Sequence, residues 1–507
     1  MLFHSFIFLF VFLPIVVAGY FLCGRFLPAR APKLWLGAAS LVFYAHWNPA
    51  LLWVLVVTIG FNLAASHVLA RAGTPARRRL TLAISIGINL AFLAWFKCAG
   101  LFTHVGFSEG LTEGITTLAL PLGISFFTFE AISYLVDSYR HNERPARAAD
   151  YLLYVAFFPH LISGPIVRFR QLMAQFAAPD FMRPQVGNIA AGLTLLSFGL
   201  AKKCLIADNA AVIANEAFRL AEMAKRFTVF DAWLGALGYT VQIYFDFSGY
   251  SDMACGLALL LNIRLPVNFL SPYRARSIAD FWRRWHITLS TFLRDYLYIP
   301  LGGNRAGPLR RNVNILITML LGGLWHGVGW TFLIWGGLHA LYLIICHTWR
   351  GWQQRLGFAL PPVFGWALTF LAVVVAWVFF RSPNLPTATS FLATMFNPKT
   401  WPLPQEVQPW LGFLGDSVRF GSPVLRGNYP TGLIALTLGA LGLALFAPNT
   451  MQLLRAMRPA DSEIPPSRCE IPASWVVSAP AALAAGLLFL ATLWWRPAKI
   501  EFLYFQF

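Results

Sequence analysis

Apolar stretches long enough to cross a membrane recur along the whole chain, and they constrain the fold more than any other feature. A helix needs about twenty mostly apolar residues to span roughly 30 Å of hydrocarbon. Several stretches are shorter, so we expect some helices to be tilted, broken or re-entrant. The sequence predicts an all-α polytopic integral membrane protein, with about 11–13 membrane helices or half-helices. The candidate stretches are residues 3–22, 34–47, 51–70, 80–103, 117–137, 188–206, 228–248, 313–328, 330–347, 361–380, 431–447 and 474–495.

Composition supports a membrane location. Hydrophobic residues make up 58% of the 507 positions and charged residues only 12%, whereas soluble proteins carry about a quarter charged residues. The mean hydropathy is +0.61. The formal net charge of +18 is strongly one-sided, but the Lys and Arg residues lie in short loops between apolar runs, as cytoplasmic loops do. We therefore expect membrane lipids, and no nucleic acid, among the partners.

The basic loops also predict an orientation. The first apolar stretch has no basic region before it and no A-x-A cleavage site, so it is predicted to be a retained helix with its N-terminus outside. Counting outward from the last basic cluster places Phe507 on the external side. The clusters predicted to be cytoplasmic are residues 77–79, 140–147, 310–311, 350–355 and 455–458.

The chain reads as one membrane domain over residues 1–507, and three of its segments stand apart from the spanning helices. Residues 264–311 are predicted to form a basic re-entrant or interfacial segment. Residues 381–430, rich in Pro and Trp, are predicted to form an external loop with interfacial elements. Residues 496–507 are predicted to be an external C-terminal tail.

The segment 264–311 carries nine arginines interleaved with apolar residues at helical spacing. Ser277 followed by Asp280 resembles an N-terminal capping box. On the predicted helix, His286 lies at the margin of the apolar stripe, beside the basic face. The residues of the stripe are Ile278, Phe281, Trp285, Leu289, Phe292 and Tyr296.

Two functions fit this basic helix. An amphipathic helix in the membrane interface presents arginines to anionic lipid. Alternatively, the arginines attract a phosphate-bearing acyl donor, because the planar guanidinium donates several hydrogen bonds to phosphate, and His286 lies at the mouth of the donor site. The periodicity alone does not separate the two.

A second buried histidine is predicted at His326, in Leu321-Gly-Gly-Leu-Trp-His326-Gly. An ionisable side chain within an apolar segment is costly and is retained mostly where it has a function, although a histidine satisfied by packing is a common alternative. His339 is interpreted as a packing residue. A metal site is not expected, because no H-x-x-x-H or H-E-x-x-H places ligands on one helical face, and the six cysteines are scattered without a C-x-x-C.

These two histidine segments make the chain resemble a known family. The run Phe281-Trp-Arg-Arg-Trp-His286, its continuation to Asn304, and the segment around His326 resemble the membrane-bound O-acyltransferase family. Within it, the likeness is to the bacterial membrane proteins of alginate, cellulose and peptidoglycan acetylation. Residues 158–170 and 242–252 support the resemblance, which runs from about residue 121 to 380.

The resemblance implies a ring of tilted helices around a central tunnel, which joins a cytoplasmic donor face to an external acceptor face. It also implies that His326 is the catalytic histidine and His286 its partner polar position. Acyl transfer from a thioester to a hydroxyl needs a base, and a neutral imidazole with a pKa near 6.5 serves as one at neutral pH. We expect His326 to be this base, and His286 to orient the donor carbonyl or donate to the oxyanion.

The chain ends in Phe502-Leu-Tyr504-Phe-Gln-Phe507. An aromatic anchor at the membrane interface explains such a run without chemistry. The ending also resembles the aromatic C-terminal acyl-transfer motif of bacterial exopolysaccharide and teichoic acid acylation systems, which implies that Tyr504 carries the acyl group to an external partner.

Other polar residues in or beside apolar segments are weaker candidates. Glu130, His160, Asp246 and Asp252 line the tunnel or pair internally as helix contacts. The residues expected to contact either donor phosphates or lipid headgroups are Arg168, Arg283, Arg284 and Arg305.

The expected function is O-acetyl transfer from a cytoplasmic thioester, with acetyl-CoA as donor substrate and no bound cofactor, to an extracellular or periplasmic polysaccharide. The resemblance implies the bacterial inner membrane and an SGNH-type, esterase-like periplasmic partner. A transporter or flippase, and an acyltransferase for lipid, protein or D-alanyl groups, are the alternatives. The sequence does not identify the polysaccharide.

Overall fold

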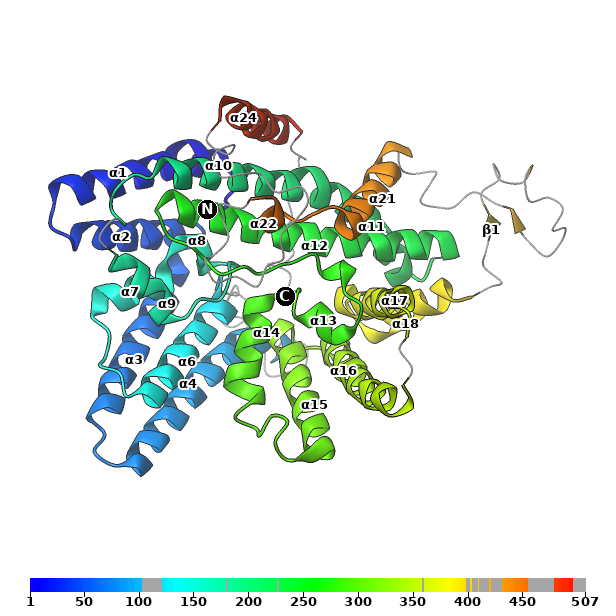
Figure 1. Ribbon diagram of the computed structural model, residues 1–507, viewed down its shortest axis with the longest axis horizontal. Helices are drawn as coiled ribbons and strands as arrows, with labels where there is room; N and C mark the ends of the chain where they lie inside the picture. The colour runs from blue at the N-terminus through cyan, green and yellow to red at the C-terminus, as the bar shows by residue number, and fades with distance from the viewer. Residues whose placement is uncertain are drawn as a thin grey trace. The chain divides into compact units, whose positions relative to one another are not determined.

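The computed structural model is built almost entirely of helices (Figure 1). It describes residues 1–102, 121–178, 181–225, 228–357, 360–397, 402–403, 409, 419–420, 431–454 and 478–495. The described residues group into two compact units. The first lies within residues 1–198, 250–267 and 454–487, and the second within 199–249, 268–453 and 488–507. The single domain predicted from the sequence stays a prediction.

The first unit begins with a helical hairpin, α1 followed by α2, which lie side by side (Figure 1). The Trp35 indole N–H on α2 donates to the Val16 carbonyl on α1 over 3.0 Å. The helices of this unit are η1 (Phe8–Phe12), α1 (Leu13–Phe26), α2 (Ala31–Ala45), η2 (Pro49–Leu51), α3 (Leu52–Arg71), α4 (Pro75–Phe102), α6 (Ile124–His141), α7 (Ala148–Ala156), α8 (Phe158–Leu161), α9 (Phe169–Phe176) and most of α10 (Val186–Ala201).

Helices α3, α4 and α6 pack together in this unit. Asn62 on α3 and Asn89 on α4 are both buried and exchange two amide hydrogen bonds of 3.0 and 2.8 Å. Such paired amides fix the register of apolar helices that lack other directional contacts.

The second unit contains the segments that carry both conspicuous histidines. Its elements are η3 (Lys202–Ala207), α11 (Asp208–Glu222), the first part of α12 (Val229–Leu260), η4 (Pro272–Arg274), α13 (Ile278–Trp282), α14 (Ile287–Leu293), η5 (Arg294–Tyr298), α15 (Gly307–His326), α16 (Trp330–Leu356), α17 (Pro362–Arg381), α18 (Leu385–Met395), the paired two-residue strands β1 (Pro402–Leu403) and β2 (Arg419–Phe420), α21 (Thr431–Phe446) and α22 (Thr450–Leu453). The boundary between the units falls within the last helix, α24 (Ala479–Trp494).

Glycines allow α15 and α16 to approach closely. A Cβ on Gly323 would lie 2.4 Å from the Phe332 carbonyl oxygen, and one on Gly336 would lie 2.4 Å from the Met319 carbonyl oxygen. Neither neighbour is a flexible side chain that can move aside. The contact sets the position of His326, which is the last residue of α15.

The segment 264–311 differs from the continuous helix that its apolar stripe predicts. The helix is broken after α13, whose C-cap is Arg283, and His286, in a left-handed conformation with φ 43°, is the N-cap of α14. Five stripe residues, from Ile278 to Phe292, are nevertheless buried. The predicted N-cap is present, since the Ser277 hydroxyl accepts from the Asp280 N–H. The Asp280 carboxylate, however, accepts from Arg276 N–H, so the reciprocal half of a capping box is not formed with Ser277.

Within the described residues, six helical segments are long and apolar enough to cross a membrane, and two further apolar helices are shorter. The chain is a multi-pass membrane protein, as the sequence predicts. The helical segment around residue 200 is longer than the predicted stretch 188–206, because α10, η3 and α11 form one continuous span. The six segments are Phe8–Phe26, Pro49–Arg71, Pro75–Cys98, Val186–Glu222, Trp330–Leu356 and Pro362–Arg381.

Candidate functional site

His286 is buried at the start of α14, with 1% of its surface exposed. Its Nδ1 lies 3.1 Å from the side-chain oxygen of Asn268. The ring packs edge-to-face on Phe247, with 4.7 Å between centroids. Burial lowers the pKa of His286 to about 3, because desolvation penalises the charged form. The imidazole is therefore neutral at physiological pH.

His326 lies at the C-terminal end of α15, and 8% of its surface remains exposed. Its ring packs edge-to-face on Trp325, Trp335 and Phe380, with centroid distances of 4.8, 5.2 and 5.0 Å. Gly327, the next residue, leaves room for the Phe332 ring, which packs against Phe380, since a Cβ on Gly327 would overlap that ring. Rigid aromatic walls hold the imidazole in one place, which is what a positioned base requires.

The two histidines flank one tryptophan. Trp325 lies 6.3 Å from His286 and 4.8 Å from His326, measured between ring centroids. On the other side of His326, Trp335 packs at 4.7 Å against His339. His339 is fully buried among aromatic rings, and its interpretation as a packing residue stays a prediction. We call the rings of His286, Trp325, His326, Trp335 and His339 the histidine cluster.

The candidate donor-binding arginines occupy different environments. Arg283 and Arg305 are exposed. Arg284 is half-buried, pairs with Asp280 over 2.9 Å and donates to the Leu270 carbonyl, so part of its hydrogen-bonding capacity is used within the fold. Two further arginines, Arg311 and Arg350, act electrostatically on His347 together with Arg283. Arg311 and Arg350 are therefore cationic side chains of the second unit in addition to the arginines predicted from the sequence to bind the donor.

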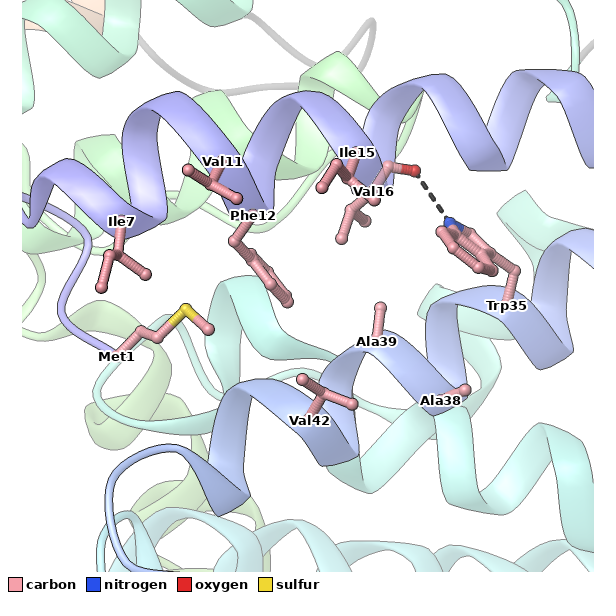
Figure 2. A pocket seen from close by; sticks show the side chains of 10 residues that line it. All are labelled: Met1, Ile7, Val11, Phe12, Ile15, Val16, Trp35, Ala38, Ala39 and Val42. Atoms are coloured by element: carbon pink, nitrogen blue, oxygen red, sulfur yellow. Dashed lines mark hydrogen bonds between the residues drawn. The ribbon is translucent and has the colours of Figure 1, made fainter.

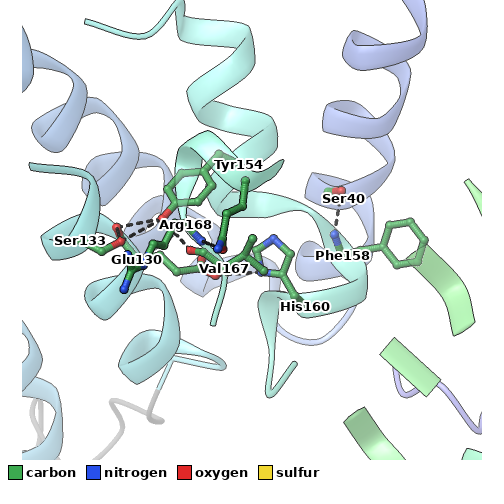
Figure 3. A network of polar contacts seen from close by, with 9 residues as sticks. Ser40, Glu130, Ser133, Tyr154, Phe158, His160, Val167 and Arg168 are labelled. Carbon is green, nitrogen blue, oxygen red and sulfur yellow. Dashed lines mark hydrogen bonds and ion pairs between the residues drawn. The ribbon is translucent and has the colours of Figure 1, made fainter. Parts of the chain in front are cut away.

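In the first unit, two of the candidate tunnel residues form a pair (Figure 3). The Nδ1 of His160 on α8 lies 3.0 Å from the Glu130 carboxylate on α6, and both side chains are buried. The Tyr154 hydroxyl lies 3.1 and 3.0 Å from the carbonyl oxygens of Glu130 and Val167. Arg168, the N-cap of α9, borders this network and is partly exposed.

Asp246 and Asp252 lie on the same helix, α12, but in different units. Asp246 lies 2.5 Å from Lys203, which also contacts Asp208 at 2.6 Å. All three are buried, and Lys203 belongs to the π-helical turn η3, a feature found frequently at functional sites. Asp252 is buried within the first unit.

A groove of about 300 Å³ lies between α1 and α2 (Figure 2). Its lining side chains are apolar except for the Trp35 indole, whose N–H is already bonded to Val16. The groove suits contact with lipid and offers no base or nucleophilic side chain. Within the described part of the chain, no three His, Cys, Asp or Glu side chains are grouped as metal ligands. Tyr504 lies outside the described residues.

The sequence segments that build the histidine cluster are those of a known enzyme family. The model of the membrane-bound O-acyltransferase family matches residues 89–385, more than half of the chain. The chain belongs to the membrane-bound O-acyltransferase family. It is therefore an acyltransferase, and its resemblance to that family is confirmed.

Individual proteins of known name are also similar to the chain. It is 42% identical over 422 residues to the peptidoglycan O-acetyltransferase of Helicobacter pylori, covering 78% of this chain and 80% of that protein. It is 44% identical over 419 residues to the probable alginate O-acetylase AlgI of Pseudomonas putida, covering 80% and 82%. The teichoic acid D-alanyltransferase of Bacillus subtilis is 27% identical over 270 residues, covering 51% and 66%.

Several residues with structural contacts at candidate site residues are not predicted from the sequence. Asn268 contacts His286 across 18 positions of sequence, and no periodicity links a residue in an irregular segment to one that far away. Lys203 carried a usable signal, because a lysine inside an apolar stretch needs a carboxylate partner. The sequence predicts Arg311 and Arg350 only as parts of basic clusters on the cytoplasmic side.

Proposed function

We propose that this protein transfers an acetyl group from a cytoplasmic thioester to a hydroxyl, for O-acetylation of an extracellular or periplasmic polysaccharide. The observation that carries the proposal is the position of His326, buried among aromatic rings yet partly accessible, in a chain 42% and 44% identical to a peptidoglycan and an alginate O-acetylating protein.

In the proposed reaction, His326 acts as the general base. It takes the proton from the attacking hydroxyl, whose oxygen forms a bond to the thioester carbonyl carbon. The carbon–sulfur bond then breaks, and the proton passes from His326 to the leaving thiolate. The products are an O-acetyl ester and a free thiol, so that no other reactant is needed. A positioned base of this kind contributes about 10² to 10⁴ in rate.

Acetyl-CoA is the proposed donor, and the cationic side chains of the second unit are suited to its phosphates. Arg283 and Arg305 are exposed, and Arg283 shares its electrostatic environment with Arg311 and Arg350. Guanidinium groups bind phosphate through several parallel N–H donors. Arg284 contributes less, because Asp280 and the Leu270 carbonyl already accept from part of its N–H donors.

Tyr504 is the proposed first acceptor. A tyrosine hydroxyl has a pKa of about 10, so it needs His326 to attack efficiently. The acetyl-tyrosine then passes its acetyl group to an SGNH-type periplasmic partner, which places it on the polysaccharide. In this scheme the protein lies in the bacterial inner membrane with its C-terminus in the periplasm.

The main alternative acyl group is D-alanyl, because a teichoic acid D-alanyltransferase is also similar to the chain. That similarity covers about half of this chain at 27% identity, whereas the O-acetylating relatives cover about four-fifths at higher identity. Family membership favours acyl transfer over a transporter or flippase, which moves its substrate without consuming a thioester.

Replacement of His326 tests the proposal. His326→Gln keeps a polar side chain but removes the base, and we expect thiol release from acetyl-CoA by the purified protein and its partner to fall about 10²- to 10⁴-fold. His67→Gln is the matched control, because His67 is exposed on α3. Full activity of His326→Gln at equal protein level contradicts the assignment. Turnover of a D-alanyl thioester in place of acetyl-CoA supports the alternative acyl group.

A further inference from the structure

Asn268 contacts His286 and the two residues that follow it at the start of α14. Its own carbonyl oxygen accepts from the Ile287 N–H over 3.0 Å. Its side chain is buried, with 2% of the residue exposed. The left-handed conformation of His286, φ 43°, is unfavourable for most residues with a Cβ. Contacts from the surrounding structure must hold such a residue in place, and Asn268 supplies several of them.

The side-chain oxygen of Asn268 faces three groups. It accepts from the Thr288 N–H at 3.3 Å and from the Thr288 hydroxyl at 3.0 Å, and it lies 3.1 Å from His286 Nδ1. A backbone N–H can only donate, so the Asn268 atom that faces it must be the oxygen and not the amide nitrogen. Because that oxygen can only accept, His286 Nδ1 must carry the hydrogen.

The protonation state of the imidazole decides whether Nε2 donates or accepts a hydrogen bond. Burial lowers the pKa of His286 to about 3, so the ring is neutral at physiological pH. A neutral imidazole carries one N–H, and its other nitrogen is an acceptor. With the hydrogen on Nδ1, Nε2 presents a lone pair.

We propose that Asn268 is a positioning residue that holds His286 in the Nδ1–H tautomer, so that Nε2 accepts a hydrogen bond from an N–H or O–H group of a substrate. The identity of the substrate group that donates to Nε2 rests on the proposed function, whereas the tautomer of His286 does not. The assignment replaces the roles expected from the sequence. Orienting a carbonyl and stabilising an oxyanion both require a donor at Nε2.

Two substrate groups supply the required hydrogen. One is the amide N–H of the pantetheine arm of the thioester donor, and the other is the hydroxyl that attacks it. In the first case His286 binds the donor. In the second it orients the acceptor, while its low pKa leaves the removal of the proton to His326.

Nitrogen-15 NMR of histidine-labelled full-length protein tests the tautomer directly. The chain has 10 histidines, and the signal lost in His286→Gln identifies this one. Between pH 6 and 8 we expect a protonated Nδ1 and an unprotonated Nε2. A protonated Nε2 together with an unprotonated Nδ1 overturns the proposal. This measurement needs no activity, so it stands or fails separately from acetyl transfer.

Substitution of Asn268 tests the positioning role. Asn268→Asp keeps an oxygen that accepts from His286 Nδ1 and Thr288, so it retains the tautomer and most activity. Asn268→Leu removes that oxygen, so the Nδ1–H tautomer of His286 is no longer favoured. We expect kcat/KM for acetyl-CoA to fall roughly tenfold, which corresponds to the loss of about one hydrogen bond. A raised KM for acetyl-CoA identifies the donor amide as the partner of Nε2. A lowered kcat at unchanged KM identifies the acceptor hydroxyl.

Wild-type kinetics and an unchanged His286 signal in Asn268→Leu contradict the positioning role. If Asn268→Leu fails to fold, the wild-type spectrum and the Asn268→Asp variant still decide the tautomer. If the wild-type spectrum shows the expected tautomer but acetyl-CoA yields no thiol, the proposed function fails and the assignment of His286 remains.

Discussion

At the scale of single residues, chemistry visible in the sequence located the candidate centre but not its supporting contacts. His286 and His326 stood out because ionisable groups among apolar neighbours are costly. The structure places both against Trp325. Asn268 did not stand out, because its importance comes from a contact across 18 positions and not from its local sequence.

Lys203 is expected to be a stability residue. Its ammonium lies between the carboxylates of Asp208 and Asp246, and Lys203→Met would leave two buried negative charges without their cation. Loss of one partner from a buried ion pair costs about 3–5 kcal/mol, so we expect a lower melting temperature in detergent. Lys202→Met is the control, because Lys202 is only half-buried and donates to the neutral Thr450 hydroxyl. Equal melting temperatures for the two variants contradict this account.

At the scale of helices and turns, the periodicity of the sequence predicts the N-cap and the buried face of the segment 264–311, but not the break at His286. The N-cap at Ser277 and the burial of the apolar stripe are present. The break at His286 was not predictable from the stripe, because apolar positions on α13 and α14 keep similar spacing on both sides of it. A left-handed residue inside the run is set by tertiary contacts, here those of Asn268.

The close approach of α15 and α16 predicts different effects for two adjacent glycines on α16. A Cβ on Gly336 would meet the Met319 carbonyl oxygen at 2.4 Å, whereas one on Gly337 would meet only the Leu320 side chain at 3.8 Å. Gly336→Ala should therefore separate the helices, displace His326 and destabilise the protein by about 1–3 kcal/mol. Gly337→Ala should retain stability and thiol release. Thermal unfolding in detergent and acetyl-CoA turnover check both, and equal behaviour of the two variants argues against this packing.

At the scale of the whole molecule, composition and the length of the apolar stretches were sufficient to predict a polytopic all-α membrane protein. The family model and six apolar helical segments confirm it. The number of membrane helices and the placement of the C-terminal tail depend on the bilayer and on residues outside the described ranges, and they stay predictions.

The distribution of basic loops predicts that Phe507 faces the periplasm. Alkaline phosphatase, which is active only after export, should therefore be active when fused after Phe507. A fusion after Arg311, near the N-terminal end of α15 on the side predicted to be cytoplasmic, is the control and should be inactive. The reverse pattern of activity would place the tail on the wrong side for the proposed relay.

The central claim is that His326 drives transfer of acetyl from a thioester to Tyr504. Mass spectrometry of the C-terminal peptide after incubation with carbon-13 acetyl-CoA tests it most directly. We predict a labelled acetyl group on Tyr504 in the wild-type protein, and none in His326→Gln or in Tyr504→Phe, which keeps the aromatic anchor and removes only the hydroxyl. Thiol release by the wild-type protein without label on Tyr504, or polysaccharide acetylation that persists in Tyr504→Phe, would contradict the account.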